Sequence, residues 1–223
     1  MDPDQWQTYL VTQQTLSEGR STVDIVEKAI DGGVDAVQLR EKEMSAADRY
    51  ELGQTLRERT AEADVDLIVN DRIDLARAID ANGVHLGQSD LPISVAREQL
   101  GDDAIIGASV STVSEARLAA ITGADYLGVG AIYGTTSKPE APTADDGLGL
   151  EALSNIVQTV KIPVVAIGGI TSDNAAEPIA AGASSVAVIS AITAADDPAS
   201  AAAALRESTD LSADETEAEV AND

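Results

Sequence analysis

Four phrases of this 223-residue chain repeat one pattern, in which a helix ends near a glycine, a short turn follows, and an apolar strand begins. The phrases are DGGVDAVQL, ANGVHLG, TGADYLGVG and AGASSVAVI. Glycine suits the left-handed conformation in which many helices end. The apolar run that follows is typical of a strand buried on both faces. Recurrence of this unit predicts parallel strands that alternate with helices.

The same unit, followed along the chain, predicts eight strands and eight helices. The strands are expected at 8–11, 36–39, 67–70, 83–86, 105–108, 126–129, 164–167 and 185–189. The helices are expected at 22–31, 46–63, 73–78, 93–100, 113–122, 150–159, 175–181 and 198–207. A doubly wound open sheet uses the same units. Eight of them in about 200 residues favour closure into a single-domain (β/α)8 (TIM) barrel.

We expect the barrel domain to span residues 1–207 and an acidic tail to follow at 208–223. The tail reads STDLSADETEAEVAND, and its high charge and few large apolar residues predict disorder. A second irregular segment, rich in Gly, Pro and Thr, follows the sixth strand at 134–149. Loops of that length often serve as lids or binding loops.

Acidic residues outnumber basic ones, with 39 Asp and Glu against 14 Lys and Arg and a net charge of −25. Such a surface repels nucleic acid, because nucleic-acid binding relies on Lys and Arg to neutralise phosphates. It also disfavours anionic membranes, so we expect neither kind of partner. Scattered acid favours solubility in concentrated salt, which screens the repulsion, and predicts a halophilic source.

Three absences narrow the class of protein further. The chain has no Cys, which excludes disulfides and thiolate metal sites. The N-terminal sequence MDPDQWQTYLVTQQ has neither the positive n-region nor the apolar h-region of a secretory signal. No apolar run approaches the ~20 residues that span a bilayer. We therefore expect a cytoplasmic protein. A homo-oligomer stays open, since no apolar stripe identifies an interface.

The active site of such a barrel forms at the carboxyl ends of its strands. From the second predicted strand to the eighth, these ends carry polar residues or glycines. They are Gln38 to Lys42, Asn70 to Arg72, Gly87 to Asp90, Ser109 and Ser111, Thr135 to Lys138, Gly168 and Gly169, and Ser190. The single histidine, His85, lies inside a strand, where packing is favoured over catalysis. One histidine also excludes poly-His metal sites.

Two charged groups at this rim indicate an anion site with a metal. Arg40 and Lys42 fit an anion, or else form a solvated pair with neighbouring glutamates. Asp71 and Asp90, each taken alone, are best explained as helix N-caps. On neighbouring strands, however, two carboxylates can share a hard cation whose shell phosphate oxygens complete. Beside Arg40, Lys42 and Lys138, the Mg²⁺ interpretation is favoured.

A second anion site is indicated on the opposite side of the rim. Gly168 and Gly169 let the backbone approach an oxyanion closely, and Ser190 offers further N–H groups. A pair of glycines after a strand also suits a tight turn, which stays open as an alternative. Barrels often hold a phosphate at the loops after their seventh and eighth strands.

From residue 8 to residue 206 the sequence resembles the thiamine-phosphate synthase family. The phrases that carry the resemblance are QLREK at 38–42, NDR at 70–72, GVHLGQSD at 83–90, GVGAIYGTTSK at 128–138, IGGI at 167–170 and VISAI at 188–192. The resemblance implies a Mg²⁺-dependent transferase that joins hydroxymethylpyrimidine diphosphate to thiazole phosphate. Its products would be thiamine phosphate and pyrophosphate.

The resemblance also implies which residues form the site. The pyrimidine diphosphate site would comprise Gln38, Leu39, Arg40, Glu41, Lys42, Asn70, Ser109 and Lys138. Arg40, Lys42, Ser109 and Lys138 are the expected catalytic residues. Asp71 and Asp90 would bind Mg²⁺, and the thiazole phosphate site would comprise Thr135, Thr136, Ser137, Gly169, Ile189 and Ser190. The chain departs from the family pattern at Ala131 and Tyr133–Gly134, and these departures concern the shape of that loop.

Three other functions remain as alternatives. A thiazole tautomerase shares the barrel but does not need Asp71, Asp90, Arg40 and Lys42 together. A sugar-phosphate isomerase or epimerase needs a positioned base, and the sequence offers no convincing carboxylate or histidine pair for one. A non-catalytic barrel that binds thiamine phosphates would not require an intact set of metal ligands and cations.

Overall fold

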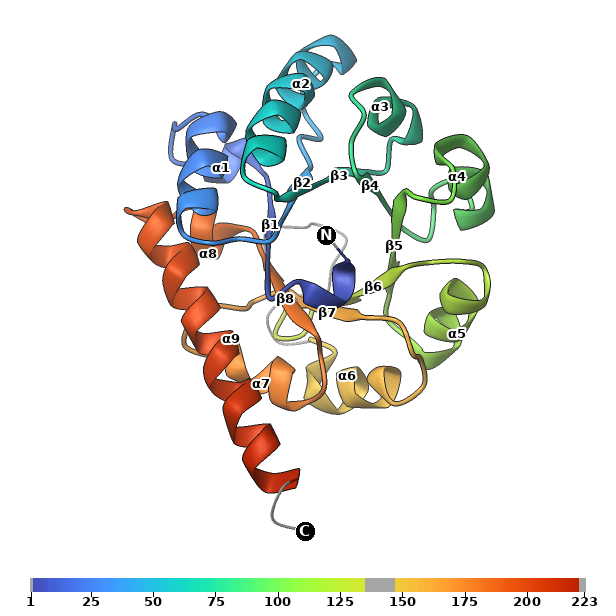
Figure 1. Cartoon of the computed structure of the whole chain (residues 1–223), viewed down its shortest axis with the longest axis vertical. Helices are drawn as coiled ribbons and strands as arrows, with labels where there is room; N and C mark the ends of the chain where they lie inside the picture. The colour runs from blue at the N-terminus through green and yellow to red at the C-terminus, as the bar shows by residue number, and fades with distance from the viewer. Residues whose placement is uncertain (1, 135–146, 221–223) are drawn as a thin grey trace.

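The computed structural model describes residues 2–134 and 147–220, the segment 211–220 as backbone only. Eight parallel strands close into a barrel in chain order, with helices outside it (Figure 1). The strands are β1 Thr8–Val11, β2 Ala36–Leu39, β3 Asp66–Asn70, β4 Gly83–Leu86, β5 Ile105–Val110, β6 Tyr126–Gly130, β7 Val164–Ile167 and β8 Ser185–Val188. The barrel closes where β8 pairs with β1, with Leu10 opposite Val188. The predicted single-domain (β/α)8 barrel is confirmed.

The helices follow the predicted order around the barrel. They are α1 Thr22–Asp31, α2 Ala46–Glu62, α3 Ile73–Ala78, α4 Ile93–Leu100, α5 Val113–Ile121, α6 Gly149–Val157, α7 Ala176–Ala180, α8 Ser190–Thr193 and α9 Pro198–Val220. The predicted strands and the first seven predicted helices agree with these bounds to within two residues. The sequence pattern did not reveal α8 or the 3-10 helices η1 Pro3–Gln5 and η2 Gln14–Leu16, because each is too short to show a helical period. Among the described helices, none combines the length and apolar character needed to cross a membrane.

The apolar core has two layers. The larger layer lies between the strands and the helices and is built from Ala, Val, Ile and Leu. The smaller layer fills the barrel interior and comprises Trp6, Tyr9, Val11, Ala36, Ile68, Ile105, Tyr126, Val165 and Ala187. Successive side chains along each strand point alternately into one layer and the other. Three of the few aromatic residues of the chain therefore lie inside the barrel.

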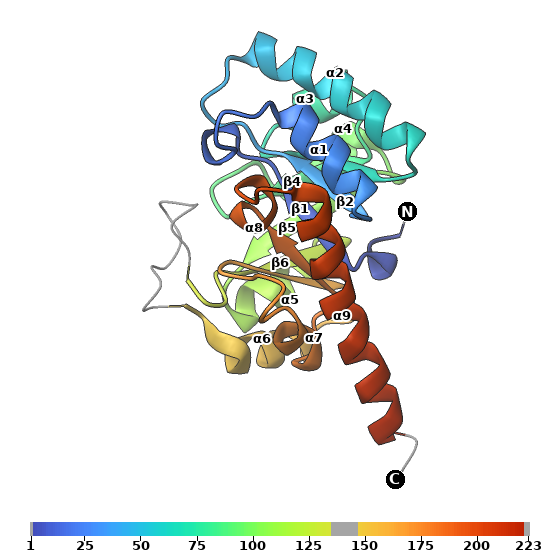
Figure 2. The ribbon, with the colours of Figure 1, turned by 90° about the vertical axis from the view of Figure 1, so that its left-hand side faces the viewer.

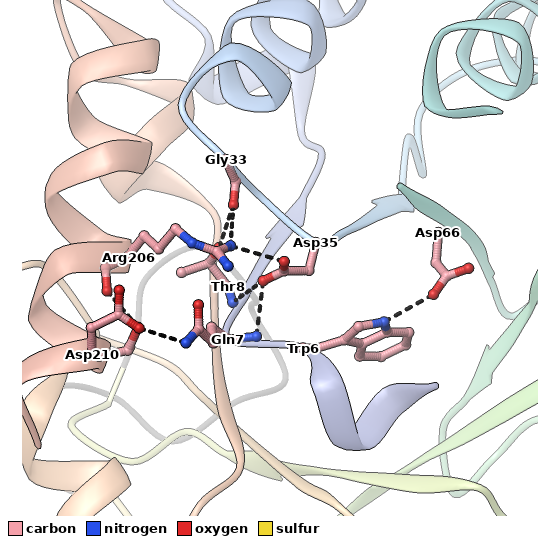
Figure 3. A network of polar contacts seen from close by, with 9 residues as sticks. Trp6, Gln7, Thr8, Gly33, Asp35, Asp66, Arg206 and Asp210 are labelled. Carbon is pink, nitrogen blue, oxygen red and sulfur yellow. Dashed lines mark hydrogen bonds and ion pairs between the residues drawn. The ribbon is translucent and has the colours of Figure 1, made fainter. Parts of the chain in front are cut away.

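The amino-terminal end of the barrel is closed by a network of polar contacts (Figure 3). Trp6 Nε1 donates to Asp66 Oδ2 at 2.9 Å, which anchors the segment before β1 beneath the barrel. The Asp35 carboxylate, 8% exposed, accepts from the backbone N–H groups of Gln7 and Thr8. Arg206 of α9 donates to Asp35 Oδ1 at 2.8 Å. The first strand and the last helix are thus joined through one carboxylate.

Helix α9 continues past the predicted domain boundary at residue 207 (Figure 2). Ser208 Oγ donates to the backbone oxygen of Ser172, Gln7 Nε2 donates to Asp210 Oδ1, and Thr209 is 4% exposed. The barrel therefore uses residues that we assigned to the acidic tail. Disorder of 208–223 stays a prediction beyond these contacts, where the backbone of α9 is helical to Val220.

Candidate active site

The carboxyl ends of the eight strands form one rim, because all the strands are parallel. The register places Asn70 opposite His85, and Ser109 opposite Gly128. The predicted residues Gln38, Asn70 and Ser109 therefore lie at the ends of β2, β3 and β5. Thr135, Thr136, Ser137 and Lys138 lie outside the described residues.

The side chains of the residues after β2 contact the chain segments around the rim. Arg40 is 7% exposed, and its Nη1 donates to Gln13 Oε1 at 2.9 Å. Glu41 is 5% exposed, and its carboxylate accepts from the backbone N–H of Gln14 and from Thr22 Oγ1. The Glu41 side chain thus orders the loop after β1, and its substrate contact stays a prediction.

Leu39 differs from its predicted neighbours in the direction of its side chain. It is 1% exposed and belongs to the outer apolar layer. A Cβ added to Gly53 of α2 would lie 3.2 Å from Leu39 Cδ2, so this side chain packs against that helix. Only the Leu39 backbone is therefore available to a ligand at the rim.

Asp71 and Asp90 lie together in the structure. Burial raises the pKa of Asp71, and a hydrogen bond with Asp90 and the charge of Asp90 raise it further. Lys42 and Asn70 act in the opposite direction on that pKa. The two carboxylates and Lys42 thus share one side of the rim. The N-cap residues of α3 and α4 are Arg72 and Pro92, so neither aspartate occupies a cap position. The capping alternative is wrong.

The carboxylate pair fits a Mg²⁺ ion. Two carboxylates in contact repel each other when both are ionised, and a cation between them removes that repulsion. Among the described residues there is no group of three or more His, Cys, Asp or Glu side chains that could hold a metal. Mg²⁺ suits such a small ligand set, since it is commonly held by one or two carboxylates together with substrate phosphates and waters. A hollow of about 440 Å³ is lined by residues that include Asp71, Ser89 and Asp90.

A row of hydrogen-bonded side chains crosses the barrel interior beneath the rim. Gln38 Nε2 donates to the Tyr9 hydroxyl at 2.9 Å, and the Tyr9 and Tyr126 hydroxyl oxygens lie 3.1 Å apart. His85 Nδ1 lies 2.9 Å from the Tyr126 hydroxyl, and His85 Nε2 lies 2.8 Å from Ser109 Oγ. We call these five residues the interior row. His85 is partly buried and makes a hydrogen bond through each ring nitrogen, and its contact with Ser109 does not follow from the sequence pattern.

The opposite side of the rim is formed by the segments after β6 and β7. Gly168 and Gly169 have positive φ angles of 102° and 71°, which side chains rarely adopt. A Cβ at Gly169 would lie 2.7 Å from the backbone oxygen of Gly134 and 2.8 Å from Tyr133 Cβ. The turn after β7 therefore packs directly on Tyr133 and Gly134, which follow β6. Ile189 and Ser190 follow β8, at the start of α8.

Comparisons with known proteins agree with this architecture. The family model described as thiamine monophosphate synthase matches residues 8–192. The chain is 60% identical over 200 residues to the thiamine-phosphate synthase of Haloarcula marismortui, covering 90% of this chain and 95% of that protein. It is 56% identical over 211 residues to the thiamine-phosphate synthase of Haloquadratum walsbyi, covering 95% of this chain and 94% of that protein. The structure of thiamine phosphate pyrophosphorylase from Pyrococcus furiosus matches with a TM-score of 0.85 and 42% identity, over 94% of this chain and 98% of that one. The chain therefore belongs to the thiamine monophosphate synthase family.

Proposed function

We propose that this chain is a Mg²⁺-dependent thiamine-phosphate synthase that joins hydroxymethylpyrimidine diphosphate to thiazole phosphate, with pyrophosphate as the leaving group. Family membership supports the reaction. The observation that carries the metal dependence is the contact between the Asp71 and Asp90 carboxylates beside Lys42. Mg²⁺ bound there would neutralise charge on the departing pyrophosphate.

The pyrimidine diphosphate is assigned to the side of the rim formed after β2, β3 and β5. Arg40 and Lys42, together with Lys138 outside the described residues, provide positive charge for the two phosphates. Gln38, Asn70 and Ser109 provide hydrogen bonds that orient the substrate. Burial of Arg40 supports this role, because a buried guanidinium is held in place and poorly hydrated.

The thiazole phosphate is assigned to the opposite side, at Thr135, Thr136, Ser137, Gly169, Ile189 and Ser190. Gly169 supports the assignment, because it lies in the turn after β7, one of the loops at which such barrels often hold a phosphate. Gly169 also packs against Gly134, which precedes Thr135 in the chain.

The proposed reaction requires no general base. Departure of pyrophosphate leaves a cation on the pyrimidine methylene, stabilised by electron donation from the ring amino group. The thiazole nitrogen then forms the new C–N bond with its own lone pair. The protein orients the two substrates and keeps water from the cation. A chain whose single histidine lies in the barrel interior can therefore catalyse it.

The alternatives make different demands on the site. A thiazole tautomerase would not use the carboxylate pair, and a sugar-phosphate isomerase would need a positioned base. A binding protein without turnover would use the same contacts but release no pyrophosphate.

We further propose that the enzyme acts in the cytoplasm of a halophile, without nucleic-acid or membrane partners, which its net charge of −25 supports.

The decisive experiment incubates the purified protein with both substrates and Mg²⁺, at low KCl and at about 2 M KCl, where charges are screened within ~3 Å. Pyrophosphate and thiamine phosphate should form in equal amounts. Both should be lost with EDTA and in the double variant Asp71→Ala/Asp90→Ala. Absence of both products at every salt concentration, in folded protein, would exclude the synthase and leave isomerisation or binding.

A further inference from the structure

The interior row links two of the residues assigned to substrate, Gln38 and Ser109, through groups that have no assigned role. Gln38 lies at one end and Ser109 at the other, with Tyr9, Tyr126 and His85 between them. Both tyrosines are completely buried, and burial raises the pKa of each phenol well above its usual range. Each phenol therefore keeps its proton. The number of protons available for hydrogen bonds along the interior row is thus fixed.

The proton count sets the direction of the hydrogen bonds. Among the described residues, the Tyr9 hydroxyl has two partners, Gln38 and Tyr126. The Gln38 amide nitrogen can only donate, so Tyr9 accepts from Gln38 and sends its own proton to Tyr126. Tyr126 then has one proton to give, and its remaining partner is His85 Nδ1.

The same count fixes the tautomer of the histidine. Since Nδ1 accepts from Tyr126, the neutral ring carries its proton on Nε2 and donates it to Ser109 Oγ, 2.8 Å away. Ser109 then receives a hydrogen bond from beneath and has its own proton left for a ligand at the rim. The reverse order would require the Gln38 carbonyl oxygen to stand where its amide nitrogen lies.

Two glycines make room for the row. A Cβ at Gly107 would lie 2.1 Å from Tyr126 Cζ, and a Cβ at Gly128 would lie 2.9 Å from His85 Cε1. Both glycines are in strands, where glycine weakens the strand unless something approaches closely. The strands β5 and β6 thus accommodate the rings of Tyr126 and His85 against their backbones.

We infer that His85 is a positioning residue, which Tyr126 holds in the Nε2–H tautomer so that Ser109 presents its hydroxyl proton to a hydrogen-bond acceptor of the pyrimidine diphosphate. Networks of this kind strengthen along their length, because each bond polarises the next. The link to the pyrimidine substrate rests on the proposed function. The tautomer and the direction of the row do not.

The direct test is nitrogen NMR of the ¹⁵N-labelled protein at neutral pH without ligand. The chain has one histidine, so the imidazole signals belong to His85 alone. We expect a neutral ring with its proton on Nε2 and an unprotonated Nδ1. A proton on Nδ1, in either the other neutral tautomer or the imidazolium, would overturn the inference whatever the enzyme catalyses.

The functional test is a double-mutant cycle between Tyr126→Phe and Ser109→Ala, measured under initial-rate conditions. Tyr126→Phe removes the proton donated to His85 and keeps the ring. We expect KM for the pyrimidine diphosphate to rise about tenfold, as for the loss of one hydrogen bond, with a smaller effect on kcat. In the Ser109→Ala background the same change should have little further effect, because the row acts through that hydroxyl.

A matched control is Thr60→Val, which removes a fully buried hydroxyl from α2, on the outer side of the barrel, and should leave KM unchanged. Gly128→Ala is a second probe, because its added methyl presses on the His85 ring without altering a polar group. It should raise the same KM.

Multiplicative effects of Tyr126→Phe and Ser109→Ala would show that the row acts on catalysis independently of Ser109 and would contradict the inference. If the wild-type protein shows no turnover at all, the proposed function is refuted, but the NMR result on His85 still stands.

Discussion

Asp71 has a left-handed backbone conformation, with φ 63°, at the point where β3 turns toward α3. Asp and Asn adopt this conformation more readily than other side chains. The Asp71 backbone N–H donates to the backbone oxygen of His85 at 2.9 Å, which fixes the turn to β4. The carboxylate is therefore held beside Asp90 by the backbone, despite the repulsion between the two.

Asp71→Asn tests whether this carboxylate serves function rather than stability. Asparagine tolerates the backbone conformation and removes one of the two adjacent charges. We expect kcat/KM at fixed Mg²⁺ to fall about a hundredfold or more, as for loss of a key electrostatic contact. In EDTA, Tm should stay the same or rise by about 2–4 °C, since relief of the repulsion is worth on the order of 1 kcal/mol.

The control is Asp74→Asn, in the same turn, where the carboxylate pairs with Arg72 and is 65% exposed. It should leave both kcat/KM and its Mg²⁺ dependence unchanged. Full activity in Asp71→Asn would remove this residue from the metal site.

At the scale of one element, α5 shows how local sequence sets a helix start. Thr112 and Glu115 form a capping box, in which Thr112 Oγ1 accepts from the Glu115 N–H and the Glu115 carboxylate accepts from the Thr112 N–H. The Ser111 N–H also donates to Glu115 at 2.7 Å. These bonds favour the charged carboxylate and lower the pKa of Glu115, with the Ser111 backbone as the largest cause.

Glu115→Gln tests the ionised cap through its pH dependence. A lowered pKa means that the folded state binds the proton more weakly, so the carboxylate stabilises the fold above its unfolded pKa. That contribution is lost as pH falls through the lower, folded pKa. At neutral pH we expect the variant to be less stable by about 0.5–1 kcal/mol in urea unfolding, and the difference from wild type should disappear in acid.

Glu98→Gln, at an exposed position of α4, is the matched control and should not change stability at either pH. A Glu115→Gln difference that persists unchanged in acid would show that the shape of the side chain, and not its charge, supports the helix start.

Across the whole molecule, the first strand and the last helix are joined to each other. Arg206 of α9 donates to the backbone oxygen of Gly33 and to Asp35, and Asp35 in turn holds the backbone at the start of β1 (Figure 3). Figure 2 shows the first part of α9 lying along the side of the barrel and its later part extending beyond it. The last helix therefore stabilises the pairing of β1 with β2 and β8 that closes the barrel.

Arg206→Met should destabilise the whole fold, because it removes a donor to a nearly buried carboxylate. The Arg206 side chain is 36% exposed, so solvent screens part of the pair, and we expect a loss of about 1–2 kcal/mol in urea unfolding. Activity of the folded fraction should be unchanged. Arg117→Met, exposed on α5, is the control. Equal effects of the two changes would exclude a closing role for Arg206.

The net charge of −25 leads to a prediction about salt. Self-repulsion weakens a compact state, and salt screens it. Tm should therefore rise continuously between about 0.1 M and 2 M KCl, over which the Debye length falls from ~10 Å to below ~3 Å. Calorimetry in KCl measures this directly. A Tm that is flat or falls over this range would contradict adaptation of the surface to salt.

Much of the barrel and the site could be predicted from the sequence, because the relevant interactions are local. Strands buried on both faces are continuous apolar runs. The runs Leu67 to Val69 and Val164 to Ile167 can therefore be recognised as strands from the sequence alone. Parallel strands place their carboxyl ends at one rim, so the order of the strands along the chain is enough to bring Asp71 near Asp90. The short sequence motifs that resemble the thiamine-phosphate synthase family then related these positions to the condensation reaction.

Tertiary structure alone decided the contacts between residues that are distant in the chain. The Tyr9 hydroxyl contacts Gln38 and Tyr126, the second of them 117 positions away, and no local pattern relates these residues. The side-chain direction of Leu39, the loop held by Glu41 and the ordering of Ser208 to Asp210 also depend on neighbours supplied by other elements. A sequence determines where a strand or helix can form through short-range periodicity. Which polar groups meet inside the closed barrel depends on register and closure, and these are settled only when all eight strands pair.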